Sequence, residues 1–553
     1  MHSTCARRLV WITAVLIAVS PFAVATELSL ARNWRGHVSD RKCGKNVDAD
    51  CNKRCIAAGE PPVLVVDGTG DVYSVSNPDA LKAYPGEHVE VTGTLVGTAL
   101  TVETAKPLRE DQSGRKGATP SYGDLYGDYR IAKGHVVGIS RFRTDAGDDA
   151  LLFSDYESGV VRRLFPASIG EFTMGPGFAL SSPIELKIEF QRDQRGVVTG
   201  LRLAAAAKPE VYAARIPISQ EEVSFASGDA KLAGTLLLPV TPGAHPAIIL
   251  LHGSGPLTRD SFGPYPFFFA SLGFAVLTYD KRGTGASTGT FMDRASFYPD
   301  DITNDALAAF DFLRRRSGVN PEKIGLWGSS EGGMLTTQVA ARSDKVAFII
   351  NSSGFMMPLW QQLLYTAKAQ LRADGFSARD ADDAEAFQRL RLRVARTGEG
   401  QEELQSVAGA SQGKKWFGIL FAGSTTSLDE LRWQWTHVYQ FDPVPALKKI
   451  KCPVLGLFGG LDVFTPASTT VATMQRALAE GGNKDVTLKV FPNANHSLAL
   501  AHSGSDGEIP ELTGQVPGLF PMLSSWLLRQ AQARGPRNSP DRLTAAHPNT
   551  VGL

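Results

Sequence analysis

The pattern of apolar and polar positions changes character at about residue 218. Before that point, short runs rich in β-branched residues alternate with turns that contain glycine and proline. After it, near-continuous apolar runs such as residues 247–251 and 274–279 alternate with longer segments of helical spacing. Strands that are buried on both faces of a parallel sheet have this continuous apolar character. The second part of the chain is therefore predicted to be an α/β domain, with a mostly parallel central sheet flanked by helices.

A long interruption of the strand pattern predicts an insertion in this domain. Residues 301–316 are a helix candidate with apolar residues at helical spacing, and further strands are predicted at residues 323–327, 346–350, 454–458 and 486–491. The interval from 350 to 454 is far longer than the usual ~2–6 residues of a connection in such a domain. Because the interval holds helix-like segments, we interpret residues of about 355–445 as a helical cap inserted in the α/β domain, which spans 218–530.

Two small β-rich modules are predicted before the α/β domain. The first covers residues 27–107, with strand candidates at 62–66, 71–75 and 88–92. The second covers residues 122–214, with strand candidates at 135–139, 150–154, 160–165, 184–190 and 197–203. It is interpreted as a non-catalytic accessory module, with carbohydrate or cell-wall binding as the alternative. The polar residues 108–121 are typical of a linker, and residues 535–553, which lack periodicity, are predicted to form a disordered tail.

The N-terminus has the organisation of a secretory signal peptide. Arg7 and Arg8 precede an apolar run at residues 9–19, and Ala23-Val24-Ala25 matches the small-residue site cut by signal peptidase. A membrane anchor is the alternative, but the run is shorter than the ~20 residues needed to span a bilayer. We therefore predict that residues 1–25 are cleaved near Ala25, that the protein is periplasmic or secreted, and that no segment inserts stably in the membrane.

Cysteine usage and charge narrow the picture further. Cys43, Cys51 and Cys55 lie close together, and export favours one disulfide bond, from Cys43 to either Cys51 or Cys55. A zinc site that recruits His37 is the less favoured alternative. Cys452 precedes an apolar run and is interpreted as a buried small side chain. The formal net charge of +1 gives no electrostatic case for a nucleic-acid partner, so a small or apolar substrate fits better.

The candidate chemistry begins at the pentapeptide Gly328-Ser329-Ser330-Glu331-Gly332. It follows the predicted strand 323–327 and precedes a helix-like segment, which is the context of a G-x-S-x-G nucleophile elbow. Such an elbow lifts the central serine clear of its own backbone, and the glycines remove side chains that would collide in so sharp a turn. Ser330 is the predicted nucleophile.

A serine nucleophile needs a base within hydrogen-bond reach and a third group that orients the base. In elbow enzymes both follow the serine in chain order. Asp462 comes directly after the strand 454–458 and His496 comes after the strand 486–491, so both are predicted at the sheet edge that carries Ser330. His502 is the other histidine of this region. Asp280, after an earlier strand, is the rival acid, although its neighbours Lys281 and Arg282 suggest a role in an ion pair or in fixing a loop.

The oxyanion that forms during attack on a carbonyl needs preset hydrogen-bond donors. One predicted donor is the backbone amide of Glu331, directly after the nucleophile. The second is predicted in the segment His252-Gly253-Ser254-Gly255-Pro256, which follows the strand 247–251. The amide of Ser254 is favoured there, and that of Gly255 is the alternative.

Taken together, these elements resemble the α/β-hydrolase superfamily over about residues 218–530. The segments 252–256, 279–285 and 328–332 look like those of bacterial exported esterases that are grouped with serine aminopeptidases and dienelactone hydrolases. One departure is Ser329, where many relatives have histidine. The resemblance implies hydrolysis of small-molecule carboxylic esters through an acyl-enzyme on Ser330, with neither a metal nor an organic cofactor.

Two alternatives remain at this stage. A serine peptidase of the aminopeptidase or acyl-peptidase type would use the same Ser-Asp-His triad and differ in its pocket. A binding protein on an inactive hydrolase fold is the other class, which the complete set of triad candidates disfavours. The aromatic residues of the cap are predicted to form its core rather than an acyl pocket: Trp360, Trp416, Phe417, Trp433 and Trp435.

Overall fold

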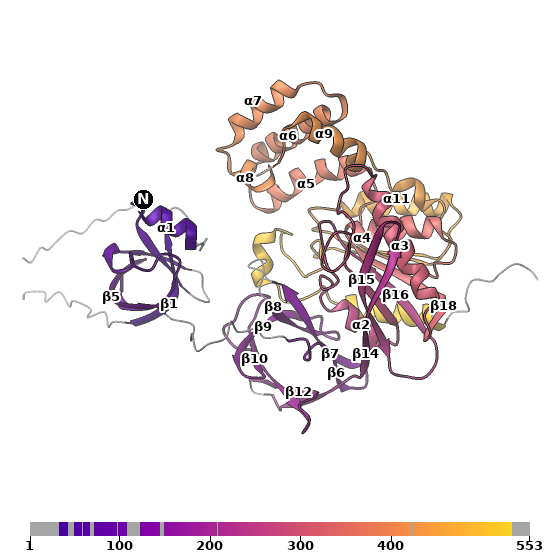
Figure 1. Cartoon of the computed structure of the whole chain (residues 1–553), viewed down its shortest axis with the longest axis horizontal. Helices are drawn as coiled ribbons and strands as arrows, with labels where there is room; N and C mark the ends of the chain where they lie inside the picture. Colours follow the sequence, from indigo (N-terminus) through magenta and orange to yellow (C-terminus); the bar gives the residue numbers. More distant parts are fainter. Residues whose placement is uncertain are drawn as a thin grey trace, which may run out of the picture. The chain divides into compact units, whose positions relative to one another are not determined.

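The computed structural model of the chain describes residues 32–41, 49–57, 59–66, 71–96, 98–107, 122–143, 149–206, 208–421 and 424–532. These residues divide into two compact units, Met1–Lys116 and Gly117–Leu553 (Figure 1). The predicted signal peptide, the linker 108–121, the tail 535–553 and Cys43 lie outside the described residues, as does the side chain of Cys51. The disulfide of the first module therefore stays a prediction. Within the described part of the chain, no helix has the length and apolar character needed to cross a membrane.

The first unit is a closed five-stranded barrel with a short helix beside it. Its strands are β1 (Arg32–Asp40), β2 (Pro62–Val66), β3 (Val72–Val75), β4 (His88–Val96) and β5 (Ala99–Pro107). The helix α1 (Ala49–Ala57) corrects the expectation of an all-β module. Its sequence is mostly polar, and Asn52 holds it to β1 by donating hydrogen bonds to Ser39 (3.2 Å) and Asp40 (2.7 Å). Ile56 of the same helix is buried in the core of the barrel. A helix of nine residues whose described side chains include one core position has too little apolar periodicity to be recognised in the sequence.

The second unit begins with a closed eight-stranded barrel. Its strands are β6 (Gly127–Ala132), β7 (His135–Arg143), β8 (Asp149–Asp155), β9 (Val161–Ser168), β10 (Glu171–Met174), β11 (Leu186–Arg192), β12 (Val198–Ala205) and β13 (Val211–Arg215). Sequence analysis identified five of these strands and missed β6, β10 and β13. The barrel is closed by antiparallel pairing of β9 with β10 and of β13 with β6. Its interior is filled by one apolar cluster that includes Tyr129, Ile139 and Leu201.

A mixed eight-stranded sheet follows, in the order β14-β15-β17-β16-β18-β19-β20-β21. The strands are β14 (Ile218–Ser227), β15 (Ala230–Pro239), β16 (His245–Leu251), β17 (Ala275–Tyr279), β18 (Val319–Ser329), β19 (Ile349–Ser352), β20 (Val454–Gly459) and β21 (Val486–Phe491). The hairpin β14–β15 is antiparallel to its neighbour, and all later neighbours pair in parallel. The predicted fold class, a mostly parallel sheet preceded by β-rich modules, is therefore confirmed.

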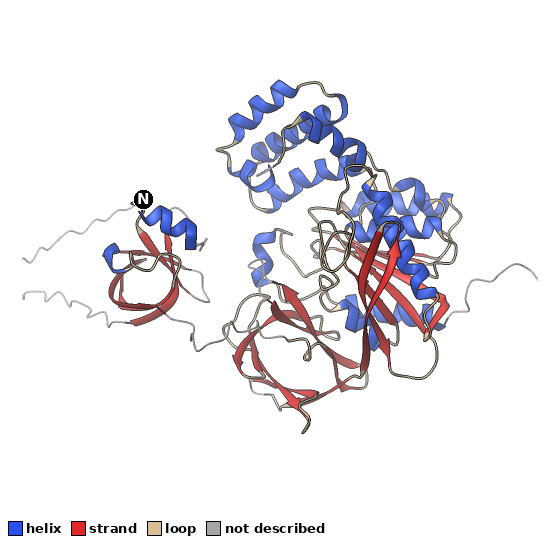
Figure 2. Ribbon diagram, viewed as in Figure 1, coloured by secondary structure: helices blue, strands red, loops and turns tan. Residues whose placement is uncertain are grey.

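Helices cover both faces of this sheet (Figure 2). One face packs against α3 (Tyr298–Arg314), α4 (Glu331–Arg342) and α11 (Ala467–Glu480), and the other against α2 (Tyr265–Ser271) and α12 (Leu519–Gln532). The helix α3 begins three residues earlier than the predicted 301–316, because Pro299 sits in its first turn, where a missing amide hydrogen costs nothing.

The segment between β19 and β20 is helical. It contains α5 (Leu359–Ala373), α6 (Ala378–Thr397), α7 (Gln401–Ser411), α8 (Lys415–Phe421), α9 (Leu428–Gln434), a π-helix (Trp435–Tyr439) and α10 (Val444–Leu447). Trp416 is buried in the core of this segment, and Phe417 and Trp435 pack against that core. Trp433 instead stacks on Arg294, with the guanidinium carbon 4.9 Å from its ring centre. Trp416, Phe417 and Trp435 thus form or pack against the core of the cap, as the sequence predicted for the five cap aromatics.

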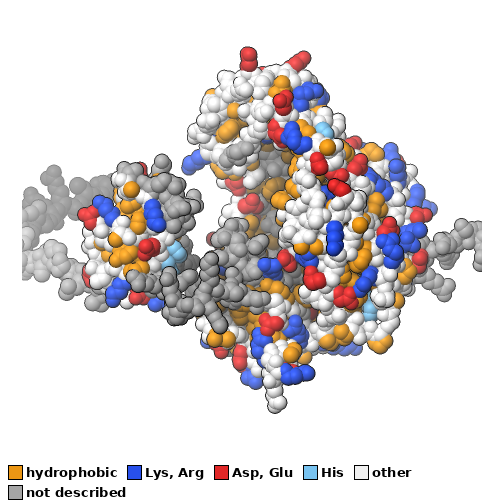
Figure 3. All heavy atoms as spheres, in the orientation of Figure 1, with side chains coloured by type: hydrophobic (Ala, Val, Ile, Leu, Met, Phe, Trp, Pro, Cys, Tyr) orange, Lys and Arg blue, Asp and Glu red, His pale blue; other side chains and the backbone are white. Residues whose placement is uncertain are grey.

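The eight-stranded barrel packs directly on the α/β domain. Leu152, Tyr156 and Val161 belong to the same apolar cluster as Phe268 of α2 and Trp526 of α12. The module that was expected to be an accessory is thus part of one compact unit with the α/β domain. On the face of the α/β domain seen in Figure 3, basic and acidic side chains are interspersed, in keeping with the near-zero net charge.

Candidate active site

Ser330 occupies the turn between β18 and α4, with φ 57° and ψ −122°. A positive φ is strained for a residue with a side chain, and such strain concentrates at functional sites. The neighbouring glycines are required by close packing. A Cβ on Gly328 would lie 2.1 Å from the carbonyl oxygen of Gly332, and a Cβ on Gly332 would lie 2.0 Å from that of Leu251. The structure therefore gives Ser330 the backbone of a nucleophile elbow, for the steric reason that the sequence pattern indicates.

Asp462 and His496 are brought together by the ends of β20 and β21. The Nδ1 atom of His496 lies 2.8 Å and 2.9 Å from the two carboxylate oxygens of Asp462, which is 2% exposed. The same carboxylate accepts hydrogen bonds from the amides of Phe464 and Thr465, both at 2.8 Å. Because a carboxylate accepts at Nδ1, the proton of the neutral imidazole sits there, and Nε2 keeps the lone pair that a general base needs.

The three triad candidates lie on the same edge of the sheet, at the carboxyl ends of β18, β20 and β21. The structure does not join Ser330 to the pair, since its hydroxyl forms no hydrogen bond with any described residue. Catalytic hydrogen bonds of this kind are often long before substrate binds and tighten in the complex. The arrangement therefore places a histidine oriented by Asp462 and a serine with a positive φ at one edge of the sheet.

The predicted oxyanion loop lies against the elbow. A Cβ on Gly253 would be 3.5 Å from the Cβ of Ser330, so the chain passes the serine at van der Waals distance. Within the described residues the backbone amides of Ser254, Gly255 and Glu331 donate no hydrogen bond. These amides are therefore available to an oxyanion, as the predicted role requires.

A buried lysine, Lys281, connects this loop to the elbow. The sequence had suggested that Lys281 acts beside Asp280 instead. The ammonium group of Lys281 donates to the carbonyl of Gly253 at 2.6 Å and to the carboxylate of Glu331 at 2.7 Å. The hydroxyl of Tyr298 donates to the same carboxylate oxygen at 3.0 Å. Lys281 is 5% exposed. One cation thus connects the residue after the nucleophile with the loop that would supply the second oxyanion donor.

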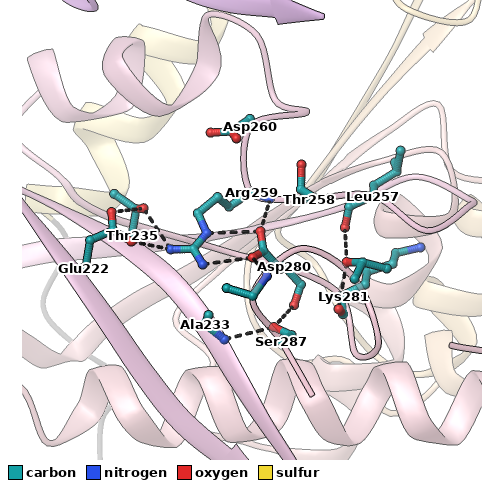
Figure 4. A network of polar contacts seen from close by, with 12 residues as sticks. Glu222, Ala233, Thr235, Leu257, Thr258, Arg259, Asp260, Asp280, Lys281 and Ser287 are labelled. Atoms are coloured by element: carbon teal, nitrogen blue, oxygen red, sulfur yellow. Dashed lines mark hydrogen bonds and ion pairs between the residues drawn. The ribbon is translucent and has the colours of Figure 1, made fainter. Parts of the chain in front are cut away.

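Asp280, the rival acid, is committed to a structural contact (Figure 4). It accepts hydrogen bonds from the guanidinium of Arg259 at 2.9 Å and 3.1 Å and from the amide of Ala286 at 2.8 Å. Burial raises the pKa of Asp280, but these hydrogen bonds outweigh burial and hold the pKa below its ordinary value. The sequence suggested an ion-pair or loop-fixing role through Lys281 and Arg282. The role of Asp280 is structural, but its partner is Arg259. Lys281 and Arg282 do not pair with it, because the side chains of consecutive residues at the end of a strand point in different directions.

The other histidines of the domain have different surroundings. Burial, helped by the charge of Lys281, lowers the pKa of His252 to about 3, so this ring stays neutral. Its Nε2 lies 3.1 Å from the carbonyl oxygen of Thr258, which fixes the ring within the oxyanion loop. His502 is exposed, and its backbone amide donates to Glu508 at 2.9 Å. Neither histidine is bonded to Asp462. His245 contacts the carbonyl of Thr241 and His437 that of Trp433, so His496 stays the base candidate.

The helical cap contacts the acid loop through α5. The hydroxyl of Tyr365 donates to the backbone carbonyl of Asp462 at 2.6 Å. The side-chain amide of Gln362 donates to the backbone carbonyl of Phe464 at 3.0 Å. The Phe464 ring in turn lies 4.9 Å from the His496 ring, centre to centre. Sequence analysis missed these positions, since a hydrogen bond to a backbone carbonyl leaves no residue-type signature at the acceptor.

A cavity of about 400 Å³ opens beside the elbow. Its lining includes Gly253 of the loop after β16, Ser329 next to Ser330, and Ser497 next to His496. Its size is that of a small-molecule binding pocket. A cavity of this size next to the elbow can therefore hold a small molecule.

The chain is similar to known hydrolases. A family model described as "Alpha/beta hydrolase family" matches residues 248–505. The esterase EstD of Thermotoga maritima is 26% identical over 375 residues, which cover 65% of this chain and 76% of EstD. Acylamino-acid-releasing enzyme 2 of Oryza sativa is 25% identical over 293 residues, which cover 52% of this chain and 32% of that enzyme. The quorum-quenching protein AidA of Acinetobacter baumannii is 27% identical over 165 residues, 30% of this chain and 54% of AidA. The chain thus spans less than two thirds of the latter two relatives.

Among solved structures, the 2,6-dihydroxy-pseudo-oxynicotine hydrolase is 20% identical, with a TM-score of 0.36, and the match covers 57% of this chain and 69% of that one. An esterase of Pyrococcus furiosus is 18% identical, with a TM-score of 0.34, over 56% of this chain and 89% of that one. The order of the sheet, the helices on both of its faces and the match of residues 248–505 to the family model lead to the same conclusion: the domain that contains these residues has the α/β-hydrolase fold and is similar to that family.

Proposed function

We propose that this protein is a serine hydrolase that cleaves carboxylic esters of small molecules, with Ser330 as nucleophile, His496 as general base and Asp462 as the residue that orients the histidine. The observation that carries the proposal is the hydrogen-bonded pair of Asp462 and His496 on the sheet edge that also holds a serine with a positive φ. The similarity to EstD, which is named an esterase, supports the substrate class.

In the proposed reaction, Nε2 of His496 removes the hydroxyl proton of Ser330 while the oxygen attacks the ester carbonyl carbon. The negative charge that develops on the carbonyl oxygen is stabilised by the amides of Glu331 and Ser254. The carbon–oxygen bond to the alcohol then breaks, and the alcohol takes the proton from His496. A water molecule, deprotonated by the same imidazole, hydrolyses the acyl-enzyme and restores Ser330. None of these steps uses a metal or an organic cofactor.

Labelling with a fluorophosphonate probe tests the assignment, because such probes modify activated serines. We expect the wild type to be labelled and to hydrolyse p-nitrophenyl acetate, and Ser330→Ala to lose both properties. Ser329→Ala is the matched control, since it removes a hydroxyl one residue away and should still be labelled. Labelling that persists in Ser330→Ala would show that another residue is the nucleophile, and a wild type that is neither labelled nor active would reject the hydrolase mechanism.

A serine peptidase of the aminopeptidase or acyl-peptidase type is the second candidate, and it is favoured by the similarity to an enzyme named as acylamino-acid-releasing. The two reactions share their triad, so the substrate decides between them. Rates on p-nitrophenyl esters, on aminoacyl anilides and on N-acetylaminoacyl anilides separate an esterase, an aminopeptidase and an acyl-peptidase. A higher kcat/KM on either anilide than on the esters would replace the esterase proposal by the corresponding peptidase.

We also propose that the protein is exported, on the basis of Arg7, Arg8, the apolar residues 9–19 and the Ala23-Val24-Ala25 site. The mature chain would then begin after Ala25. Cell fractionation followed by mass spectrometry of the intact protein tests this directly. A cytoplasmic protein that retains its first residues would overturn the proposal.

A further inference from the structure

We infer that the eight-stranded barrel β6–β13 forms one wall of the substrate pocket, and that this pocket takes an apolar group of the ester. The inference rests on the proposed function, which it deepens by assigning the barrel a part in substrate recognition. The structural observation is the composition of the cavity beside Ser330. Four barrel residues are part of its lining, namely Phe142 of β7, Leu152 of β8, Val161 of β9 and Phe178 after β10.

The side-chain alternation of β8 explains why a barrel offers such a wall. Successive residues of a strand point to opposite faces, so Leu151 and Phe153 point into the barrel and join its core. Leu152, between them, points outward and packs with the α/β domain. The same division occurs on β7, where Ile139 lies in the barrel core and Phe142 packs with the α/β domain. An outer face exposed to water would carry polar residues at these positions.

The barrel wall is fixed with respect to the catalytic edge by main-chain contacts. The amide of Gln515 donates to the carbonyl of Gly159 at 2.7 Å, and Val160 forms a β-bridge with Gly514. Arg162 donates from Nε to the carbonyl of Thr513 at 3.1 Å. Gly514 and Gln515 themselves line the cavity. Barrel and pocket therefore hold a defined geometry, as a specificity-determining wall requires.

The chemistry of the lining selects the ligand. The α/β side contributes apolar and aromatic surface from Leu251, Phe262 and Trp327, and the Phe142 and Phe178 rings of the barrel meet edge to face at 5.3 Å. None of the described lining residues is Asp, Glu, Lys or Arg, and His252 stays neutral. A free amine or a carboxylate would enter without a counter-charge, which is costly. An alkyl or aryl group of the ester gains from the same surroundings.

This group is attached either to the carbonyl carbon or to the leaving oxygen, and two substrate series distinguish these cases. One series keeps p-nitrophenol and lengthens the acyl chain from acetyl to octanoyl. The other keeps acetate and lengthens the alcohol from ethyl to octyl. The measured quantity is the ratio of kcat/KM for the long ester to that for the short ester, because a ratio cancels differences in the amount of folded enzyme.

Two barrel variants test the wall in opposite directions. Leu152→Trp fills the pocket and is expected to lower the ratio at least about tenfold in one of the series, since a pocket contact of methylene size is worth ~10–200-fold in kcat/KM. Phe178→Ala, in a partly exposed loop, enlarges the pocket and avoids a buried substitution; it is expected to change the ratio by a similar factor. Ile169→Ala is the matched control, because Ile169 is a fully exposed apolar residue on the same barrel.

A change in the acyl series places the acyl chain against the barrel, and a change in the alcohol series places the alcohol there. Ratios equal to the wild type in both series for both variants, with ester hydrolysis intact, overturn the inference and leave the proposed function standing. A wild type that hydrolyses no ester overturns the proposed function and the inference with it.

Discussion

Replacing Lys281 by methionine tests whether one buried ammonium group holds the proposed oxyanion hole in place. The Lys281 and Glu331 side chains are 6% and 12% exposed, and the ammonium also holds the carbonyl of Gly253. Methionine keeps the apolar stem of lysine. After the substitution, the Tyr298 hydroxyl is the remaining hydrogen-bond donor to the Glu331 carboxylate among the described residues. The Gly253 carbonyl loses the hydrogen bond from the ammonium group.

The structure sets the expected magnitudes. Removing one partner of a buried ion pair costs ~3–5 kcal/mol of unfolding free energy. Because the Tyr298 hydroxyl still donates to Glu331 at 3.0 Å, we expect the lower end, about 3 kcal/mol. The released loop runs beside Ser330, and a ~1 Å displacement of a catalytic group costs up to ~10²-fold in rate. We therefore expect kcat to fall by about 10- to 100-fold while KM changes little, since the loop contacts the charge that develops during reaction.

Urea unfolding gives the stability, and hydrolysis of p-nitrophenyl acetate below the unfolding transition gives kcat and KM. In the double variant Lys281→Met, Glu331→Gln the unpaired charge is gone, so stability should recover while kcat stays low, because Gly253 still lacks its lysine. Lys345→Met, at an exposed position of the same domain, is the control and should change stability by less than ~0.5 kcal/mol. An unchanged kcat in the single variant refutes the positioning role, and a stability loss below ~1 kcal/mol refutes the argument from the buried pair.

Three further predictions concern other contacts. Burial raises the pKa of Asp128 from 3.8 to about 7, so the native state holds an extra proton between these values and stability should fall by roughly 4 kcal/mol as pH rises from about 4 to 7. Asp128→Asn should abolish that slope in urea unfolding measured at both ends of this range, and an unchanged slope would assign it to other groups. Tyr365→Phe should cost ~1 kcal/mol, because its hydroxyl bonds the main-chain carbonyl of Asp462, and should leave kcat nearly unchanged, which a large kcat loss would contradict. Gly332→Ala should cost at least ~3 kcal/mol by overpacking, whereas Gly409→Ala in α7, with open space around it, should stabilise by ~0.4–1 kcal/mol; equal effects in the unfolding assay would argue against the steric account of the elbow.

The fold was predictable because its decisive signals are local. The strands β16, β17 and β20 are short apolar runs buried on both faces, and each can be recognised without knowing its neighbours. The chain order of Ser330, Asp462 and His496 is also a local signal, because each follows a strand of the same parallel sheet. The catalytic role of these residues stays a prediction that serine labelling decides. The helix α1 escaped prediction, since it is short and is attached by the polar side chain of Asn52 together with the buried Ile56 rather than by an extended apolar stripe.

Contacts between distant loops were not predictable in the same way. Asp280, Lys281 and Arg282 are adjacent in the chain, yet they pair with Arg259, Glu331 and Asp305 respectively. The partners of the first two lie 21 and 50 residues away along the chain. Oppositely charged residues that are adjacent in a sequence suggest an ion pair between them. At the end of a strand, however, consecutive side chains point to different elements. Only the three-dimensional arrangement reveals that Lys281 serves the elbow and that Asp280 does not.

The second barrel shows why a sequence can carry a functional signal that pattern analysis cannot assign. The run Leu151-Leu152-Phe153 is apolar at every position, which predicts a strand buried on both faces but not what covers its outer face. In the structure the α/β domain covers that face, and the cover is incomplete where the cavity lies. The apolar surface that lines the cavity beside Ser330 stays in contact with water and does not contribute the free energy of hydrophobic burial. A ligand that fills the cavity supplies that burial, so the docking of the barrel and the binding of an apolar group draw on the same side chains, and substitutions at Leu152 are expected to affect both.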